Sequence, residues 1–270
     1  MKLSSSTPPP LPLRFVAGES EPLQRQIITE QPVSLTVNGK AWLTLMCTPI
    51  DLEALAVGFL FNEGVLKNRA EIEVVQVCPN KDNVDIWLNH ATEPPENWRR
   101  TSGCTGGKTS VSPERLRPHL QNGFVLTPWQ VQEQVELLNR AQTLYRETGG
   151  VHTSILTDGQ EVIARGEDVG RHNTLDKIAG QCLLQNLHPA RKILVTSGRI
   201  SSEMIQKAAR IGAPVVISRT SPTSLSAQLA HAWGITLIGY ARRNEFTLYA
   251  TPERIVQKTE TILPLLRSNF

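Results

Sequence analysis

The feature that most constrains the fold is the alternation of strand and helix patterns in the second half of the chain. From Val151 onward, short apolar strand patterns such as "KILVT", "PVVIS" and "ITLIG" are separated by amphipathic patterns such as "SEMIQKAARIG". Strands that are joined by helices of this length pair in parallel, and the helices cover the sheet. The pattern predicts an α/β core over residues 127–270, which opens with a capping box at Thr127 and a helix that runs to about Arg146.

The first half has a different pattern of apolar and polar residues, which predicts a smaller α+β region over residues 21–126. Asn38-Gly39 lies between two alternating apolar stretches, which is a strong hairpin signal. "DLEALAVGFLFNEG" predicts an amphipathic helix that starts near Asp51 and is capped by Gly64, and "EIEVVQV" and "NVDIWL" predict two further strands. Residues 1–20 are rich in Ser and Pro, and we expect a disordered lead-in there.

Composition narrows the class of protein. The 270 residues are 40% hydrophobic and 20% charged, with a formal net charge of +3, which suits a globular chain but is too mild for a nucleic-acid binder. No apolar run approaches the roughly 18 residues of a membrane helix, and no export signal is visible. The four cysteines match neither a disulfide framework nor a zinc pattern. We expect a cytoplasmic protein without nucleic-acid or membrane partners.

Several loops at predicted strand ends carry hydroxyl groups and arginines. Helix N-termini and the carboxyl ends of parallel strands meet at such loops, so these residue types suit phosphate groups. The alternative for each loop is that Ser and Thr simply cap the next helix. No standard nucleotide-binding loop occurs. The candidates for an anion site are Ser197, Arg199, Arg219, Thr220, Ser221, Thr223, Arg242 and Arg243. In the "GEDVGRHN" loop, Asp168 and Arg171 are expected to pair, and His172 is a candidate for acid/base chemistry or for orienting a ligand. The alternative for this loop is a helix entry in which Asp, Arg and Asn cap the first turn.

"TSGCTGGK" places Cys104 among glycines and hydroxyl residues, whereas a cysteine that packs in a core lies among apolar residues. Nearby cations favour the reactive thiolate form. A Cys/His hydrolase would need His172 or His152 beside the thiol. A dithiol centre is disfavoured because Gly107 stands where a second cysteine would be, and zinc is disfavoured because no ligand set has suitable spacing. A single nucleophilic or carrier cysteine remains.

A set of longer motifs resembles the FdhD family of formate dehydrogenase accessory proteins. The matching stretches include "TPIDLEALAVGFLFNEG", "TSGCTGG", "EDVGRHNTLDKIAG", "TSGRISSEMIQKAARIGAP" and "SPTSLSAQLAHAWGITLIGYAR", and they run in order along most of the chain. The resemblance implies a cytidine-deaminase-like three-layer core without the deaminase zinc. It also implies a sulfurtransferase that takes sulfur as a cysteine persulfide from a cysteine desulfurase. The acceptor that the resemblance implies is the molybdenum cofactor, bis-molybdopterin guanine dinucleotide, which receives the sulfur before its insertion into formate dehydrogenase.

The resemblance also assigns residues. Cys104 matches the persulfide-forming cysteine, and the cofactor-binding segment falls on Tyr240, Ala241, Arg242, Arg243, Asn244 and Glu245. By position, we expect Arg171, His172, Ser197, Arg199, Ser221 and Thr223 to contribute to the same ligand, and a homodimer is the family-level expectation. The chain departs from the family at Gly107, where many members have a second cysteine, and at Asn244-Glu245, where members often have glycine and then arginine. The alternatives are a cofactor chaperone that transfers no sulfur and a nucleotide hydrolase or deaminase relative.

Overall fold

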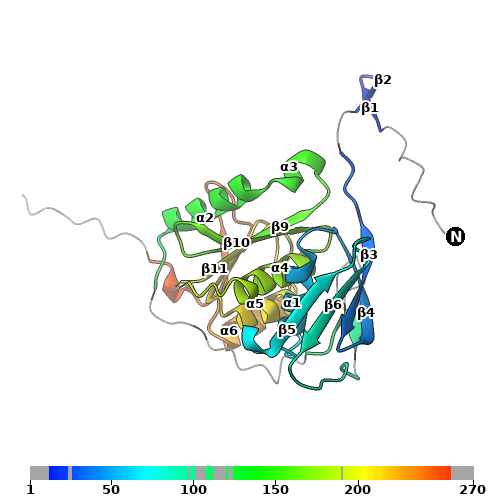
Figure 1. Cartoon of the computed structure of the whole chain (residues 1–270). Coiled ribbons are helices and arrows are strands. Elements are labelled where there is room, and N and C mark those ends of the chain that lie inside the picture. Colours follow the sequence, from blue (N-terminus) through cyan, green and yellow to red (C-terminus); the bar gives the residue numbers. More distant parts are fainter. Residues whose placement is uncertain are drawn as a thin grey trace, which may run out of the picture.

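A mixed six-stranded sheet forms the centre of the C-terminal half (Figure 1). The computed structural model describes residues 12–23, 26–96, 98–100, 108–111, 120, 124–189 and 191–256. The central strands β11, β12 and β13 pair in parallel, whereas β9 runs antiparallel to both of its neighbours and β14 antiparallel to β13. The predicted α/β class is therefore confirmed, with antiparallel strands added at both sides. In spatial order the strands are β10 (Val162–Asp168), β9 (His152–Thr157), β11 (Ile193–Thr196), β12 (Val215–Ser218), β13 (Thr236–Gly239) and β14 (Thr247–Ala250).

Helices cover both faces of this sheet. On one face α2 (Pro128–Ala141) packs through Val135 and Leu138 against Val195. On the other face lie α4 (Arg171–Leu184), α5 (Ser202–Ile211) and α6 (Ser224–Ala232), where Leu194 joins their core cluster. Neighbouring residues of β11 thus point to opposite apolar layers, which explains why this strand is apolar from Ile193 to Val195.

A second sheet of four strands belongs to the N-terminal half, in the order β4-β3-β6-β5. Helix α1 (Leu52–Asn62) packs on this sheet and on α4, and most of its residues are buried, so it is a core helix rather than an amphipathic one. The two helices touch at glycines: a Cβ added at Gly58 would lie 1.8 Å from the Asp176 carbonyl oxygen, and one at Gly180 would lie 1.9 Å from that of Ala54. The strands are β3 (Gln31–Val37), β4 (Lys40–Cys47), β5 (Ile72–Val77) and β6 (Asn83–Leu88), with a short 3-10 helix η1 (Arg69–Glu71) before β5.

Two local signals in the sequence are confirmed. Asn38 and Gly39 have φ angles of 48° and 77°, and they form the turn between β3 and β4. At the start of α2, the Thr127 side chain accepts from the backbone N–H of Gln130 while the Gln130 side chain accepts from the N–H of Thr127. Local chemistry therefore fixes these two boundaries. The division into two regions at residue 126 stays a prediction. Helices α1 and α4, which lie on opposite sides of this boundary in the sequence, pack against each other.

The helix after Thr127 is shorter than the sequence predicts. It ends at Ala141, and a separate short helix, α3 (Leu144–Thr148), follows. The cause is Glu167 of β10, whose carboxylate accepts from the backbone N–H groups of Thr143, Leu144 and Tyr145 at 2.9–3.2 Å. An acceptor that satisfies three consecutive free N–H groups starts a new helix, so the helical conformation is interrupted at Gln142.

The "GEDVGRHN" motif is also arranged differently from the predicted loop. Strand β10 continues to Asp168, because its last residues still pair with β9, and α4 begins at Arg171. Arg171 and His172 therefore stand in the first turn of a helix, with Gly170 as its N-cap.

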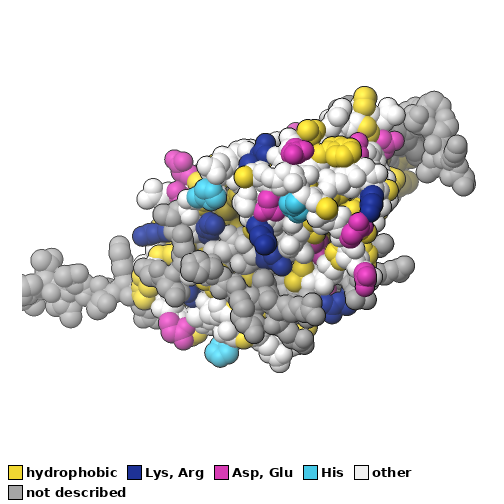
Figure 2. Space-filling model, turned by 60° about the horizontal axis from the view of Figure 1, so that its bottom comes forward, with side chains coloured by type: hydrophobic (Ala, Val, Ile, Leu, Met, Phe, Trp, Pro, Cys, Tyr) yellow, Lys and Arg dark blue, Asp and Glu magenta, His cyan; other side chains and the backbone are white. Residues whose placement is uncertain are grey.

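Two small hairpins and one short helix complete the described residues. β1 (Leu13–Val16) pairs with β2 (Glu19–Pro22) in a projecting hairpin, part of which falls in the expected lead-in (Figure 1). β7 (Arg99–Arg100) pairs with β8 (Lys108–Thr109), and η3 (Pro252–Arg254) lies near the end. Basic and acidic side chains are interspersed on the face shown in Figure 2, in keeping with the small net charge. No helix in the described ranges is long and apolar enough to cross a membrane.

Candidate functional site

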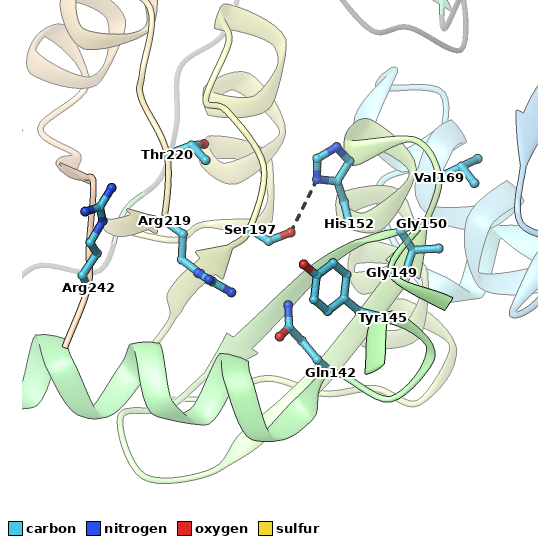
Figure 3. A pocket seen from close by; sticks show the side chains of 11 residues that line it. Gln142, Tyr145, Gly149, Gly150, His152, Val169, Ser197, Arg219, Thr220 and Arg242 are labelled. Atoms are coloured by element: carbon cyan, nitrogen blue, oxygen red, sulfur yellow. Dashed lines mark hydrogen bonds between the residues drawn. The ribbon is translucent and has the colours of Figure 1, made fainter. Parts of the chain in front are cut away.

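A cleft of about 560 Å³ opens at the carboxyl ends of the parallel strands. Ser197 follows β11, Arg219 and Thr220 follow β12, and Arg242 follows β13. Because β9 is antiparallel, its first residue, His152, reaches the same edge of the sheet. Figure 3 shows His152 and Ser197 on one side of this space, Tyr145 and Gln142 below it, and Arg219 and Arg242 toward the other end. The remaining lining residues are Gly149, Gly150, Val151 and Val169.

The cleft is suited to an anion. Arg219 and Arg242 are both exposed and line it, and none of its described lining residues is acidic. Arg219 donates to Asn139 of α2 at 3.3 Å, and Arg242 pairs with Glu245 at 3.4 Å across an exposed turn. Guanidinium groups and short hydroxyl side chains match phosphate oxygens, and the volume falls within the range of small-molecule sites.

The surroundings of His152 favour its neutral form. Burial lowers its pKa most, and the cations Arg171 and Arg199 lower it further. Its Nδ1 lies 3.5 Å from Ser197 Oγ, and Ser197 Oγ in turn accepts from the backbone N–H of Thr153 at 3.0 Å. A neutral imidazole in this position can donate or accept one hydrogen bond toward a ligand, and it adds no charge to the cleft.

Gly198 brings the β11–α5 loop close to α4. A Cβ added there would lie 3.0 Å from Arg171 Cβ and 3.5 Å from His152 Nδ1, so both side chains pack around this glycine. The predicted residues Arg171 and Ser197 thus lie at one end of the cleft together with His152. Arg171 is buried and contributes positive potential to that end rather than lining the cleft.

His172 points elsewhere. Its Nε2 lies 3.3 Å from Ser201 Oγ and 4.0 Å from Glu203, on the α5 side of the helix. Burial, followed by the charges of Lys207 and Arg171, holds its pKa well below the usual value. His172 is not among the residues that line the cleft.

The rest of the same motif joins the two halves of the chain. Asp168 forms a fully buried ion pair with Lys177 at 2.8 Å, and its carboxylate also accepts from the backbone N–H of Thr48 at 3.1 Å and from Asn173. Asn173 Nδ2 donates to the Met46 carbonyl oxygen. The Asp168 carboxylate thus finds its ion-pair and hydrogen-bond partners within the fold, which makes this part of the motif structural.

Three other predicted residues lie outside the cleft lining. Thr223 is the N-cap of α6 and accepts from the backbone N–H of Ser226. The carbonyl oxygen of Ser221 accepts from the backbone N–H of Ile200, which ties two strand-end loops together. Arg199 is exposed and close enough to affect the pKa of His152. For Thr223 the capping alternative describes the observed contact.

The segment from Tyr240 to Glu245 divides between two clefts. Tyr240 has a φ of 51° and is 44% exposed, and Ala241 is buried. Arg242 lines the main cleft, whereas Arg243 and Asn244 line a neighbouring hollow of about 620 Å³ beside Trp129. Glu245 closes the turn, because its carbonyl oxygen accepts from the Arg242 N–H at 2.8 Å.

Cys104 lies outside the described residues, but its flanking strands do not. The register pairs Arg99 with Thr109 and Arg100 with Lys108, so the residues on either side of positions 101–107 are paired with each other. Among the other cysteines, burial raises the pKa of Cys47 to about 12 and that of Cys182 to about 11, which disfavours their thiolates. Cys78 Sγ is engaged by Asp82 and by the N–H of Asn83.

Within the described ranges, no group of three or more His, Cys, Asp or Glu side chains could hold a metal ion. Sequence reasoning missed Gln142 and Tyr145, because the helix break at Gln142 depends on Glu167, which is distant in sequence. It also left His152 and the pair Gly149-Gly150 out of the anion site. The Asp158-Gly159 dipeptide in the sequence is the available signal. A turn there indicates an antiparallel hairpin, and because β9 also runs antiparallel to β11, its first residue lies at the carboxyl ends of the parallel strands.

Comparisons with known proteins agree on one family. Residues 28–256 match the model of the FdhD/NarQ family. A protein of Staphylococcus haemolyticus named sulfur carrier protein FdhD is 34% identical over 249 residues, which cover 90% of this chain and 94% of the relative. The protein of the same name from Staphylococcus aureus strain MRSA252 is 34% identical over 92% of this chain and 96% of its own. A crystal structure assigned as a formate dehydrogenase accessory protein of Desulfotalea psychrophila superposes with a TM-score of 0.76, 28% identity, and coverage of 91% of this chain and 98% of the other.

Proposed function

Because the chain belongs to the FdhD/NarQ family, we propose that it is a sulfur carrier that matures formate dehydrogenase through a persulfide on Cys104. The Cys104 thiolate attacks the terminal sulfur of a persulfide on a cysteine desulfurase. A new S–S bond forms on Cys104 as the desulfurase cysteine leaves as a thiolate. The acceptor is the molybdenum cofactor, bis-molybdopterin guanine dinucleotide, before its insertion into the dehydrogenase. In this second step the S–S bond breaks, Cys104 leaves as a thiolate, and the reduced cofactor supplies the two electrons that convert the terminal sulfur to the sulfide level. The observation that carries the proposal is the similarity to sulfur carrier proteins over nine tenths of the chain.

The cleft supports the choice of acceptor. The guanine dinucleotide arms of the cofactor carry phosphate groups, and the lining supplies Arg219, Arg242, Ser197 and Thr220. Of the residues assigned from sequence, we propose Ser197 and Arg242 as direct contacts. Arg171 and Arg199 act by adding positive potential at the His152 end. Arg243 and Asn244 would meet only a part of the ligand that extends into the neighbouring hollow.

The other cysteines support the choice of carrier. The thiolates of Cys47 and Cys182 are disfavoured by burial, and Cys78 is held by two hydrogen-bond partners. The cations in the flanking strands, Arg99, Arg100 and Lys108, lie next to the segment of Cys104 in sequence. Such charges stabilise a thiolate and attract an anionic acceptor.

We propose further that the C-terminal part has the cytidine-deaminase-like fold that the family resemblance implies. The α2 layer, the mixed sheet and the layer of α4, α5 and α6 support it. Of the two histidines that a Cys/His hydrolase would need, His172 lies against Ser201, outside the cleft lining, whereas His152 lines the cleft.

The test is sulfur loading followed by intact-mass measurement. The protein is incubated with a cysteine desulfurase and cysteine, and we expect a gain of one sulfur atom that a reductant removes. Cys104→Ser should abolish the gain, whereas the matched variants Cys78→Ser and Cys182→Ser should keep it. A Cys104→Ser protein that still gains reducible sulfur would refute the assignment of the carrier cysteine and favour a chaperone that only binds and delivers the cofactor.

A further inference from the structure

The last turn of α1 holds both flanks of the segment that contains Cys104, and we infer that Phe59 and Glu63 are positioning residues for sulfur transfer. The inference deepens the proposed function and rests on the carrier role of Cys104. It assigns these two side chains the task of fixing where the cysteine segment leaves the body of the protein. Neither residue is among those that line the cleft.

The contacts are direct. Glu63 Oε2 accepts from the backbone N–H of Ser110 at 2.6 Å and from Ser110 Oγ at 2.8 Å. The ring of Trp98 stacks on Phe59, with centroids 5.9 Å apart and planes inclined by 23°. Phe59 and Glu63 are four residues apart and so share one face of the helix. Trp98 precedes β7 and Ser110 follows β8, so one helical turn docks both ends of the hairpin.

The position of Glu63 is informative because a carboxylate is poorly placed there. Glu63 is the C-cap of α1 and only 7% exposed, where the carbonyl end of the helix repels negative charge and burial removes hydration. The helix end is already satisfied by Gly64, which has a φ of +78°. The guanidinium of Arg210 lies against Gly64 and its charge offsets that of Glu63. What the carboxylate does, and a neutral apolar residue could not, is bind Ser110.

The turn is firmly tied to the core. Asn62 Nδ2 donates to Asp176 of α4 at 2.7 Å, and Lys207 of α5 pairs with the same carboxylate at 2.6 Å. The Lys207 ammonium also lies 5.8 Å from the centre of the Phe59 ring, within cation–π range. The platform of Phe59 and Glu63 is therefore fixed relative to α4, whose first residue, Arg171, packs at the edge of the cleft.

Such a platform matters for transfer more than for loading. A small persulfide donor diffuses freely to a thiol and needs no fixed orientation. Delivery to a bound acceptor requires the terminal sulfur to meet one atom, and a misplacement of about 1 Å can cost about 100-fold in rate. We therefore expect loss of Glu63 to separate the two half-reactions.

The experiment compares Glu63→Ala with Glu63→Gln, whose amide oxygen still accepts from Ser110. Glu53→Ala is the matched control, because Glu53 is an exposed carboxylate in the first turn of the same helix. Loading is measured by intact mass with cysteine hydropersulfide as donor. Transfer is measured as single-turnover activation of cofactor-free formate dehydrogenase by the loaded protein with bis-molybdopterin guanine dinucleotide bound to it, and the melting temperature of each variant is recorded.

The expected result is a drop in transfer rate of about 10- to 100-fold in Glu63→Ala, with loading unchanged and most transfer restored in Glu63→Gln. Adding Ser110→Ala to Glu63→Ala should cause little further loss, because the two residues act as one contact. The inference would be overturned if Glu63→Ala transferred sulfur at the wild-type rate, or if loading and transfer fell in parallel with thermal stability. Either result would leave the proposed function standing. A wild-type protein that takes up no sulfur would overturn the proposed function and the inference with it.

Discussion

Glu167 links the fold to the cleft, and its removal gives a sharp test of how α3 is formed. The carboxylate accepts from the N–H groups of Thr143, Leu144 and Tyr145, and from Thr153 Oγ1 at 3.0 Å. Because α3 carries Tyr145 into the cleft, Glu167→Ala perturbs both stability and the binding wall.

The magnitude follows from these four contacts. The partly buried N–H groups of α3 can be rehydrated, so losing their shared acceptor costs about 1 kcal/mol, as for an N-cap. Removing a negative charge from a helix N-terminus costs a further ~0.5 kcal/mol. The Thr153 hydroxyl is fully buried and loses its carboxylate acceptor, at about 1–2 kcal/mol. We expect a total loss of about 3 kcal/mol in the free energy of unfolding.

The assay is equilibrium urea unfolding followed by circular dichroism, with Glu161→Ala as the control because Glu161 is exposed in the neighbouring turn. In the double variant Glu167→Ala/Thr153→Val the unpaired hydroxyl is gone, so the loss should be smaller than the sum of the single losses. A Glu167→Ala protein as stable as the control, or strictly additive losses, would refute this reasoning.

Two further predictions concern charge. The pKa values of His152 and His172 are lowered by burial from the unfolded value of 6.5, so the unfolded chain binds more protons than the folded one as the pH falls through 6.5. The contribution of these histidines to the free energy of unfolding should therefore be fully present above pH 6.5 and decline below it. In urea unfolding at a series of pH values, His172→Gln should make the free energy of unfolding depend less steeply on pH. An unchanged dependence on pH would contradict the burial argument. Separately, Arg219→Ala should weaken binding of guanosine diphosphate about 10-fold in calorimetry, with Arg14→Ala in the projecting hairpin as the control. Equal affinity of both variants would place the anion elsewhere.

Much of the fold was predictable because local chemistry decides it. The Asn38-Gly39 turn, the Thr127 capping box and the apolar strand β11 each carry their own signal in a few residues. The helix break at Gln142 was not predictable in the same way. It depends on an acceptor that β10 delivers from 22 to 24 residues away, and periodicity reports nothing about such a contact.

The residues of the site also divide into those that local sequence rules predict and those that depend on tertiary packing. Ser197 and Arg242 were predictable from the rule that ligands gather at strand ends, and both line the cleft. Arg171 and His172 occupy neighbouring positions of one motif but point to different surroundings, because they stand in a helical turn and not in a loop. The docking of Ser110 on Glu63 pairs residues 47 positions apart, and the bond from Asn62 to Asp176 of α4 ties the same turn to the core.

The most direct measurement of the central claim is formate dehydrogenase activity in cells that lack their own sulfur carrier and express this chain. The wild-type protein should restore activity, and Cys104→Ser should not, although it binds guanosine diphosphate with unchanged affinity. That combination separates sulfur delivery from cofactor binding. Full activity with Cys104→Ser would contradict the account and show that the protein serves the dehydrogenase by carrying the cofactor alone.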